Sequence, residues 1–262
     1  MGLIKYLHIG RISFKNNLAY KTDFLVGSLF IALIIFILIN LWQTMYADRA
    51  VIEGFTITMM IWYLVMTESI VTSPGRVIEQ MGDEIRSGDI AQKLNKPYNY
   101  VLFHYAESMA KSAQRFVLTF LFGGIVTLLL IGPLTFNLNH FFPILLVVIL
   151  ALTLHFTLMA LISVFALWLE DSKSMHFIYQ KVVFVLGGML LPLDIFPDWL
   201  ASIGKSLPFS FIAYFPAKLF VGFNWNDFLI LIAKQIGWIL IFVACTIIVY
   251  RISFKRISIN GG

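Results

Sequence analysis

The sequence predicts an all-α, polytopic membrane protein with six transmembrane helices in a single domain over residues 1–262. Hydrophobic residues make up 60% of the 262, charged residues only 13%, and the mean hydropathy is +0.87. A soluble domain carries about 25% charged residues, and a soluble core of this size could not hide so much apolar surface. Lipid is therefore the solvent, and the length allows about six spans of ~20 residues with their connecting loops.

Residues 1–22 mix apolar and basic side chains and predict an amphipathic helix lying at the membrane surface. Ile4 and Leu7 alternate with Lys5 and Arg11, as in helices that bury one face among lipid headgroups. The alternative is a flexible basic flank that only sets the orientation of the first span.

Six apolar runs predict the membrane spans. Glu68 lies inside the second run and His155 near the middle of the fourth. A carboxylate in a span marks a proton or substrate path, or else reaches a polar partner or the nearby interface. A lone histidine relays protons, or joins two helices through a hydrogen bond. The runs extend from about Phe24 to Trp42, Gly54 to Thr72, Phe116 to Ile131, Phe142 to Leu169, Val182 to the break at Gly187, and Phe228 to Tyr250.

The longest polar segment, Gly75–Pro97, separates the second and third runs and carries eight charged residues. Ile78, Met81 and Ile85 recur at helical spacing among these charges. That spacing predicts an amphipathic helix held just outside the bilayer. The alternative is an ordinary solvated loop.

Local signals divide this polar segment further. Ser87-Gly88 is expected to end the first helix, because Gly tolerates a positive φ. Asp89 is expected to cap a second short helix, which Pro97 stops. Beyond Pro97, polar residues recur every three to four positions as far as Arg115, so one helical face stays wet where the chain approaches the third span.

A second unusual segment, Gly187–Gly222, is apolar but interrupted by prolines. Irregular backbone at membrane depth is allowed only where protein or a wet cavity satisfies its polar groups. We expect a pair of short re-entrant helices, the first starting at Asp198-Trp199 and separated from the second by Pro208. The alternative is a surface loop with interfacial helices. The prolines are Pro192, Pro197, Pro208 and Pro216.

Basic residues are distributed unequally between the two sides of this layout. Six spans place both termini on one side, and fifteen of the 19 Lys and Arg residues fall there. The positive-inside rule then predicts that both termini and Gly75–Pro97 are cytosolic. The net charge of +5 follows from this topology and does not call for a nucleic-acid partner. The basic residues on the other side are Arg49, Lys205, Lys218 and Lys234.

The sequence contains no recognisable catalytic or metal-binding pattern. It lacks a Gly-rich phosphate loop ending in Lys-Ser or Lys-Thr, a His-Glu-x-x-His motif and a Gly-x-Ser-x-Gly elbow. Cys245 is its single cysteine. The chain is therefore expected not to be an enzyme and to hold no cofactor or metal.

Three other classes of protein remain as alternatives at this point. An ion-coupled secondary transporter would need carboxylates near the midplane of the bilayer, where only Glu68 comes close. A membrane-embedded hydrolase would need a polar constellation that the sequence does not offer. A membrane protein without any transport role is the third alternative.

Two stretches carry a resemblance to a known family. The stretch EIRSGDIAQKLNKP (Glu84–Pro97) resembles the first cytosolic loop of ABC-2 type transporter permeases, in particular the six-span bacterial members that pair with a separate ATPase. The stretch from Gly187 to Gly222 is similar to the same family in its order of Gly, Pro-Leu, Phe-Pro, Trp-Leu and Pro. Leu207 departs from the family, which often has Asn before the last proline. The matching residues are Gly188, Pro192-Leu193, Phe196-Pro197, Trp199-Leu200 and Pro208.

The resemblance implies the permease subunit of an ATP-binding cassette exporter in a bacterial cytoplasmic membrane. Two permease chains, identical or different, would form the pathway through the lipid bilayer. A cytosolic ATPase dimer, which binds the ATP and Mg²⁺, would power it. Residues 1–22 would be the elbow helix, Gly75–Pro97 the coupling segment that docks on the ATPase, and Gly187–Gly222 the outer re-entrant cap.

The resemblance also assigns roles within these segments. In the coupling segment, apolar side chains would be buried against the ATPase, and charged ones would set register and specificity. The apolar set is Ile78, Met81 and Ile85, and the charged set is Glu79, Asp83, Glu84 and Arg86. The cap would include Gly188, Pro192, Pro197, Trp199 and Pro208.

Overall fold

Three helices in the described part of the chain are long and apolar enough to cross a membrane. The computed structural model describes residues 2–19, 21–165 and 172–257. The three helices are α6 (Tyr100–Leu130), α7 (Phe141–Phe165, preceded by the 3-10 turn η1, Leu138–His140) and α11 (Trp225–Ile257). Three shorter apolar stretches lie in α2 (Lys21–Met45), α3 (Ile57–Val71) and around α10 (Tyr214–Val221). The six-span layout therefore stays a prediction.

The remaining elements are also helical, in agreement with the predicted all-α class. Within the described ranges, the regular structure outside helices is an isolated bridge between Ile52 and Phe55. The remaining elements are α1 (Gly2–Ala19), α4 (Val77–Arg86), α5 (Asp89–Leu94), α8 (Ser172–Leu186), η2 (Leu193–Ile195), α9 (Asp198–Ser206) and η3 (Pro208–Phe211).

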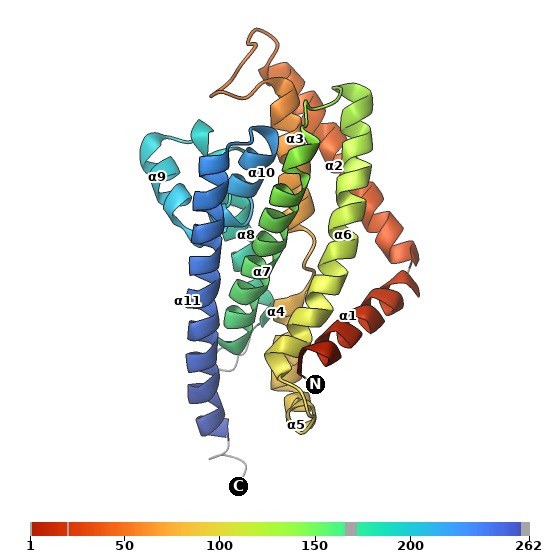
Figure 1. Cartoon of the computed structure of the whole chain (residues 1–262), viewed down its shortest axis with the longest axis vertical. Coiled ribbons are helices and arrows are strands. Elements are labelled where there is room, and N and C mark those ends of the chain that lie inside the picture. The colour runs from red at the N-terminus through yellow and green to blue at the C-terminus, as the bar shows by residue number, and fades with distance from the viewer. Residues whose placement is uncertain (1, 20, 166–171, 258–262) are drawn as a thin grey trace.

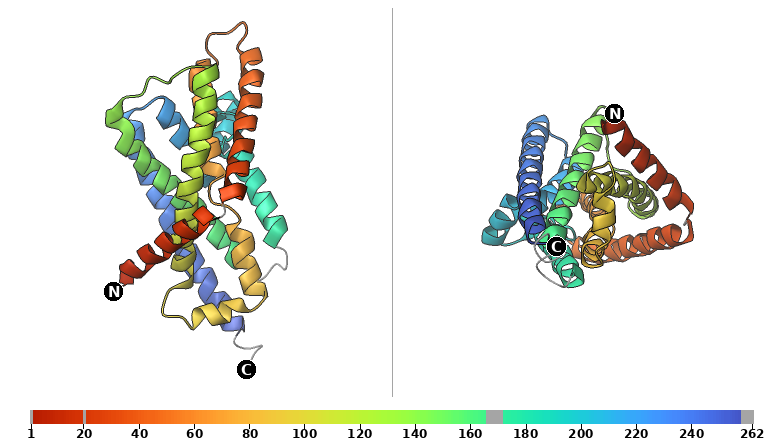
Figure 2. Two further views of the ribbon diagram at one scale, coloured as in Figure 1. Left: turned by 90° about the vertical axis from the view of Figure 1, so that its right-hand side faces the viewer. Right: turned by 90° about the horizontal axis from the view of Figure 1, so that it is seen from below.

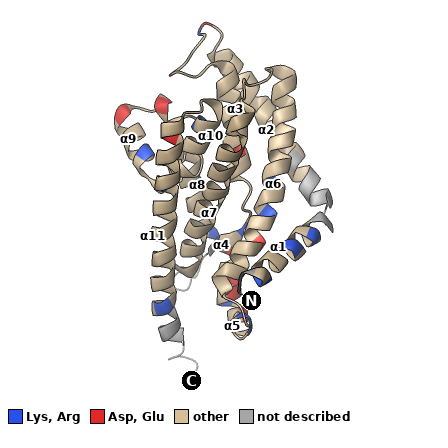
Figure 3. Cartoon of the chain, in the orientation of Figure 1, with Lys and Arg blue, Asp and Glu red and all other residues tan. Residues whose placement is uncertain are grey.

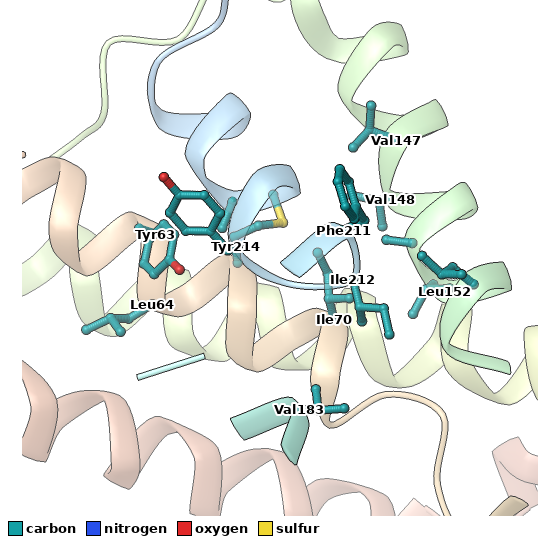
Figure 4. Packing of buried hydrophobic residues seen from close by; sticks show 14 of the residues in the cluster. Tyr63, Leu64, Ile70, Val147, Val148, Leu152, Val183, Phe211, Ile212 and Tyr214 are labelled. Carbon is teal, nitrogen blue, oxygen red and sulfur yellow. The ribbon is translucent and has the colours of Figure 1, made fainter. Parts of the chain in front are cut away.

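Helix α3 forms the centre of the bundle. Every residue from Met60 to Ile70 is buried, as expected for a helix that is apolar on all sides. Helices α2, α6, α7 and α10 pack around it. Figure 4 shows how its Tyr63 and Ile70 lie among side chains of α7, α8 and the segment around Phe211. Glu68 of α3 is only 2% exposed. Its carboxylate is therefore buried inside the bundle and does not extend to the membrane interface, which was one of the alternatives given by the sequence.

The start of α3 differs from the sequence prediction. The second run was predicted to begin at Gly54, but the helix begins at Ile57. Glu53 and Gly54 both have positive φ and form a tight turn that lets Ile52 and Phe55 exchange backbone hydrogen bonds. Thr56 then caps the helix, because its side chain accepts a hydrogen bond from the backbone N–H of Met59.

Helix α6 joins two stretches that the sequence treated separately. From Tyr100 on, the wet stretch that ends at Arg115 continues into the third predicted span as one helix of 31 residues, which ends at Leu130. At 1.5 Å per residue it is ~46 Å long, well beyond the ~30 Å of a bilayer core. Asn99 starts it by accepting a hydrogen bond from the N–H of Leu102 at 3.1 Å. The polar half of α6 therefore extends outside the apolar layer.

The start of α8 corrects a second prediction. The fifth span was expected to begin near Val182 after a polar loop, but the helix already runs from Ser172. Lys181 fits within it because its ammonium group lies over the rings of Phe177 and Phe184, at 5.1 and 5.6 Å from their centroids. Glu170 and Asp171, which precede α8 in the sequence, lie outside the described residues.

The cap follows the predicted pattern. Helix α8 ends at the Gly187-Gly188 break, α9 begins at Asp198, and Pro208 begins the turn η3 that separates α9 from α10. Pro197 precedes α9 at its N-cap position. Two short helices therefore occupy Gly187–Gly222, as predicted, and whether they are re-entrant stays a prediction.

The two ends of the bundle differ in charge. Helix α5, the first turns of α1 and the last described turns of α11 lie at the same end, whereas α9 and the loop before α3 lie toward the other (Figures 1 and 2). Figure 3 shows Lys and Arg on α1, α4, α5 and α6 near the α5 end, and acidic residues beside a lysine around α9. We call the α5 end the basic end. The described ends of α1 and α11 therefore lie at one end of the bundle, and the side of the membrane that this end faces stays a prediction.

Gly188 gives a test of the junction between α3 and the cap. It has φ +71, and an added Cβ would lie 3.1 Å from both the Tyr63 hydroxyl and the Tyr214 Cβ. We expect Gly188→Ala to cost about 2–4 kcal/mol, from backbone strain and overpacking together. Thermal unfolding of the purified protein in detergent would measure it.

Two glycines serve as controls for this substitution. Gly54 also has positive φ (+81) but no atom within 4 Å of the added Cβ, so Gly54→Ala should cost only about 1 kcal/mol of strain. Gly237 of α11 also has open space and no positive φ, so its Ala variant should be neutral or slightly stabilising. Equal melting temperatures for the Gly54 and Gly188 variants would contradict the packing argument.

Candidate functional site

Helix α4 has the predicted amphipathic character, but its apolar face is covered by the protein itself. Ile78 and Met81 are fully buried, at 0% exposure, where α4 packs against α7 and α8. Ile85 is half-buried. The expectation that Ile78 and Met81 contact a partner is therefore corrected, because neither side chain reaches the surface. Spacing alone revealed the apolar face but not what covers it.

The turn between α4 and α5 follows the prediction with one change. Ser87 continues α4 through its N–H to the Asp83 carbonyl at 2.8 Å, and Gly88 then takes the left-handed conformation at φ 81. Asp89 was expected to cap the second helix but is its first residue, and Gly88 holds the cap position. Instead, the Asp89 carboxylate accepts a hydrogen bond from the Ser87 hydroxyl at 2.8 Å. Helix α5 ends at Leu94, before Pro97.

The carboxylate of Glu84 joins α4 to α5 and α6. Its Oε1 lies 2.5 Å from the Lys93 ammonium on α5. Its Oε2 accepts a hydrogen bond from the Tyr100 hydroxyl at 2.9 Å and lies 2.9 Å from His104 Nε2, both on α6. The Glu84 side chain is only 14% exposed and His104 only 3%. We call these four residues the Glu84 network.

A second carboxylate extends the network along α6. Glu107 lies 2.6 Å from the Lys111 ammonium and 3.7 Å from His104 Nδ1. His104 is thus placed between the carboxylates of Glu84 and Glu107. The sequence places these polar residues on one wet face of the helix, but it does not show that they pair with Glu84. Their helical spacing beside an acidic amphipathic segment was the available signal.

The electrostatics of Glu84 follow from these contacts. Burial by itself would raise the pKa of the carboxyl group. Hydrogen bonds from His104, Lys93 and Tyr100 oppose that effect and lower the pKa of Glu84 from its ordinary value of 4.5 to about 2. The carboxylate therefore stays charged at neutral pH and holds the three helices together there.

The other charged residues predicted for docking lie nearer the surface. Asp83 and Arg86 form an exposed ion pair at 2.5 Å. Glu79 lies 3.7 Å from Arg76. Glu84, in contrast, is turned inward. The exposed surface of the segment belongs mainly to the α4–α5 turn and α5, and comprises Asp83, Arg86, Ser87, Gly88, Asp89, Ala91, Gln92, Leu94, Asn95, Lys96 and Pro97.

Helix α1 is hydrogen-bonded to the residues just before α6 and to α6 itself. Lys5 donates to the Pro97 carbonyl at 2.7 Å, and the Tyr6 hydroxyl accepts from the Asn99 N–H at 2.9 Å. Farther along, the Gln114 side chain accepts from the Asn17 amide at 2.8 Å. These bonds explain how a helix with exposed apolar residues is held along α6 (Figure 2).

The cap is built around Asp194. Its Oδ1 lies 2.8 Å from the Lys205 ammonium of α9. Its Oδ2 lies 2.9 Å from the Lys218 ammonium and accepts a hydrogen bond from the Tyr214 hydroxyl at 2.7 Å, both on α10. The carboxylate thus joins η2, α9 and α10, and a net positive charge remains among the four residues at neutral pH.

Buried hydrogen bonds join the cap to α3. The Tyr63 hydroxyl donates to the Gly188 carbonyl, and the Thr67 hydroxyl donates to the Met189 carbonyl at 2.8 Å. Among the predicted cap residues, Gly188, Pro192 and Pro208 are buried and Pro197 is exposed. Trp199 is 66% exposed on α9, so it does not pack into the core with the others.

Fold and site together define a helical membrane protein with a polar helical segment at one end of the bundle and a proline-broken segment toward the other. The family model described as "ABC-2 family transporter protein" matches residues 27–261. Because the match covers most of the chain, the chain belongs to the ABC-2 transporter family. It is therefore the membrane domain of an ABC transporter permease, a transport subunit of a kind that works with an ATPase. A search of curated proteins found no match.

The Glu84 network can be tested by removing its charge. Glu84→Gln keeps the size of the side chain but leaves Lys93 and His104 without their carboxylate, and we expect it to cost about 2–4 kcal/mol. Hydrogen exchange should rise throughout α5 and the first turns of α6. Asp83→Asn, in the exposed pair one residue earlier, is the control and should cost at most about 1 kcal/mol. Equal exchange in the two variants would contradict a structural role of the network.

The same variants give the expected pH dependence. The pKa of Glu84 is lowered in the folded chain, so its contribution to stability is complete above about pH 4.5 and is lost as the pH falls toward 2. Glu84→Gln should lose this contribution at every pH, so the stability difference from the native chain should shrink through that window. A constant difference would show that Glu84 does not carry the effect.

Proposed function

We propose that the chain is the permease subunit of an ATP-binding cassette exporter in a bacterial cytoplasmic membrane, driven by ATP hydrolysed on a separate ATPase dimer. The family supports the general role. The concentration of Lys and Arg near the basic end supports a cytosolic position for that end, because basic residues are retained on the cytosolic side. Export, rather than import, follows the resemblance of the two sequence stretches.

The observation that carries the proposal is the α4–α5 hairpin at the basic end. Its apolar face is wedged into the bundle against α7 and α8, and Glu84 fastens its tip to α6. A displacement of α5 would therefore be transmitted to α6, α7 and α8 together. This is the property that a coupling segment needs, because ATP-driven motion must shift the spans between two arrangements.

The docking surface that we propose differs from the one read from the sequence. Ile78 and Met81 hold the hairpin in place from inside. The exposed side chains of the α4–α5 turn and α5 would make the contact with the ATPase, with Leu94 (38% exposed) as an apolar anchor and the charges of Asp83 and Arg86 setting specificity. A second permease chain, identical or different, would complete the pathway.

An ion-coupled transporter is the second candidate, and one observation favours it. Glu68 is a carboxylate buried in the central helix α3, at 2% exposure, and such residues bind coupling ions in secondary transporters. The two readings differ in their energy source. ATP hydrolysis stimulated by the reconstituted permease would support the exporter, whereas transport driven by an ion gradient without an ATPase would support the alternative.

Docking can be tested by co-purification of the ATPase from native membranes. We expect Ala91→Asp with Leu94→Asp to reduce the recovered ATPase by about tenfold or more, because a contact centre loses apolar surface and gains charge. The tagged permease itself should remain folded, since both side chains are exposed. The amount of ATPase per permease, by mass spectrometry, is the measurement.

Two controls separate docking from folding. Val51→Asp changes an exposed apolar residue (52% exposed) in the loop before α3, toward the opposite end, and should leave ATPase recovery unchanged. Met81→Asp should instead unfold the chain, because Met81 is fully buried. Undiminished ATPase recovery with the α5 variant would contradict the proposed docking surface.

The orientation of the cap gives a separate test. In a Cys245→Ala background, single cysteines at Ser202 and Ser206 of α9, both exposed, should react with a membrane-impermeant thiol reagent added outside intact cells. A cysteine at Ser87, in the α4–α5 turn, should react only after the membrane is opened. Labelling of α9 only from the cytosolic side would contradict the proposed topology.

A further inference from the structure

A polar cavity of about 350 Å³ lies near the basic end, among the end of α3, the start of α4 and helices α6, α7 and α8. Its polar lining is rich in hydrogen-bond donors, and none of its described lining residues is Asp or Glu. This composition favours a negatively charged ligand. The polar side chains are Thr72, Arg76, Arg115, His155, His176, Tyr179, Gln180 and Lys181.

Three of these side chains carry buried polar atoms that lack a partner. His155 Nδ1, His176 Nδ1 and the Tyr179 hydroxyl form no hydrogen bond. The three residues are only 4%, 7% and 4% exposed, respectively, and the rings of His155 and Tyr179 are 5.6 Å apart. All three residues belong to the lining of the cavity, and burying such groups without partners is costly. A bound ligand that accepts hydrogen bonds would supply the missing partners.

The cations beside these groups are also incompletely paired. No carboxylate in the described chain forms an ion pair with Arg115. Arg76 meets Glu79 only at 3.7 Å, and its side chain is 82% exposed. An added Cβ on Gly75 would lie 2.9 Å from Arg115 Nη1, so the glycine lets the guanidinium approach the backbone at the cavity wall.

Gly75 and Arg76, the two residues before α4, line the cavity on the side of that helix. The apolar part of the lining, with Val71, Met159 and Phe184, offers room for a short hydrocarbon portion beside the charge.

We propose that this cavity binds an oxyanion, namely a phosphate group attached to a larger molecule or free in solution. Arg115 supplies the charge, His155, His176 and Tyr179 supply donors from α7 and α8, and Gly75 and Arg76 complete the lining before α4. The phosphate can come from a phospholipid headgroup or from a soluble phosphate compound. Binding is a property of this chain alone and does not depend on the pairing with an ATPase proposed above.

The source of the phosphate can be separated with the full chain purified in detergent. Phosphatidylglycerol retention is followed by native mass spectrometry, with phosphatidylcholine as the neutral lipid. Protection by inorganic phosphate is followed as a shift in melting temperature. Selective retention of phosphatidylglycerol without a phosphate shift assigns the site to a lipid headgroup, and a phosphate shift without lipid selectivity assigns it to a soluble compound.

Matched variants tie the binding to this cavity. Arg115→Gln should weaken the observed binding by about tenfold or more, because it removes the charge-assisted contact. Arg11→Gln removes the same charge from an exposed position on α1 and should change binding by less than about twofold.

Tyr179→Phe separates a loss of ligand binding from a loss of folding stability. Its hydroxyl has no partner, so its removal should leave the stability without ligand unchanged or slightly raised. The same change should weaken binding by about three- to tenfold, as expected for one lost hydrogen bond. Absence of both lipid selectivity and a phosphate shift, or equal losses in the Arg115 and Arg11 variants, would overturn the proposal. Either result would leave the ATPase co-purification test unaffected.

Discussion

The bonds of the Glu84 carboxylate hold together the end of the molecule on which the proposed coupling depends. Three helices meet at this side chain, because α4 carries the carboxylate, α5 provides the Lys93 ammonium, and α6 provides the Tyr100 hydroxyl and a ring nitrogen of His104. A carboxylate in this position is stable only because these partners replace water. The charge of Glu84 therefore fixes the position of α5 relative to the start of α6.

Beneath this junction, the wedge of α4 connects the proposed docking surface to the interior. Ile78 and Met81 fill the space against α7 and α8. The polar cavity uses the start of α4 and the same two helices as its walls. A shift of α4 would therefore change the lining of the cavity, and a ligand bound in the cavity would in turn affect the position of α4.

Local backbone signals were predictable from the sequence, and long-range pairings were not. The ends of α4 and α8 at glycines, the start of α9 at Asp198 and the break at Pro208 all depend on conformational limits of the residues themselves. The contacts of Glu84 with His104 and of Asp194 with Lys218 join residues 20 and 24 positions apart. Such pairs depend on how helices pack. For the same reason the apolar face of α4 could be recognised, but not the helices that cover it.

The unbroken length of α6 has a mechanical consequence. The helix passes from the Glu84 network at one end to the far side of the bundle without a proline or a gap. At about three quarters of its length, a Cβ added to Gly123 or Gly124 would already be in van der Waals contact, at 3.4–3.5 Å from Ile35, Val65 or Trp62 of α2 and α3. Because α6 is continuous and its glycines allow a close contact with α2 and α3, the helix would pivot at this contact. A sideways push at its polar end would swing its opposite end the other way.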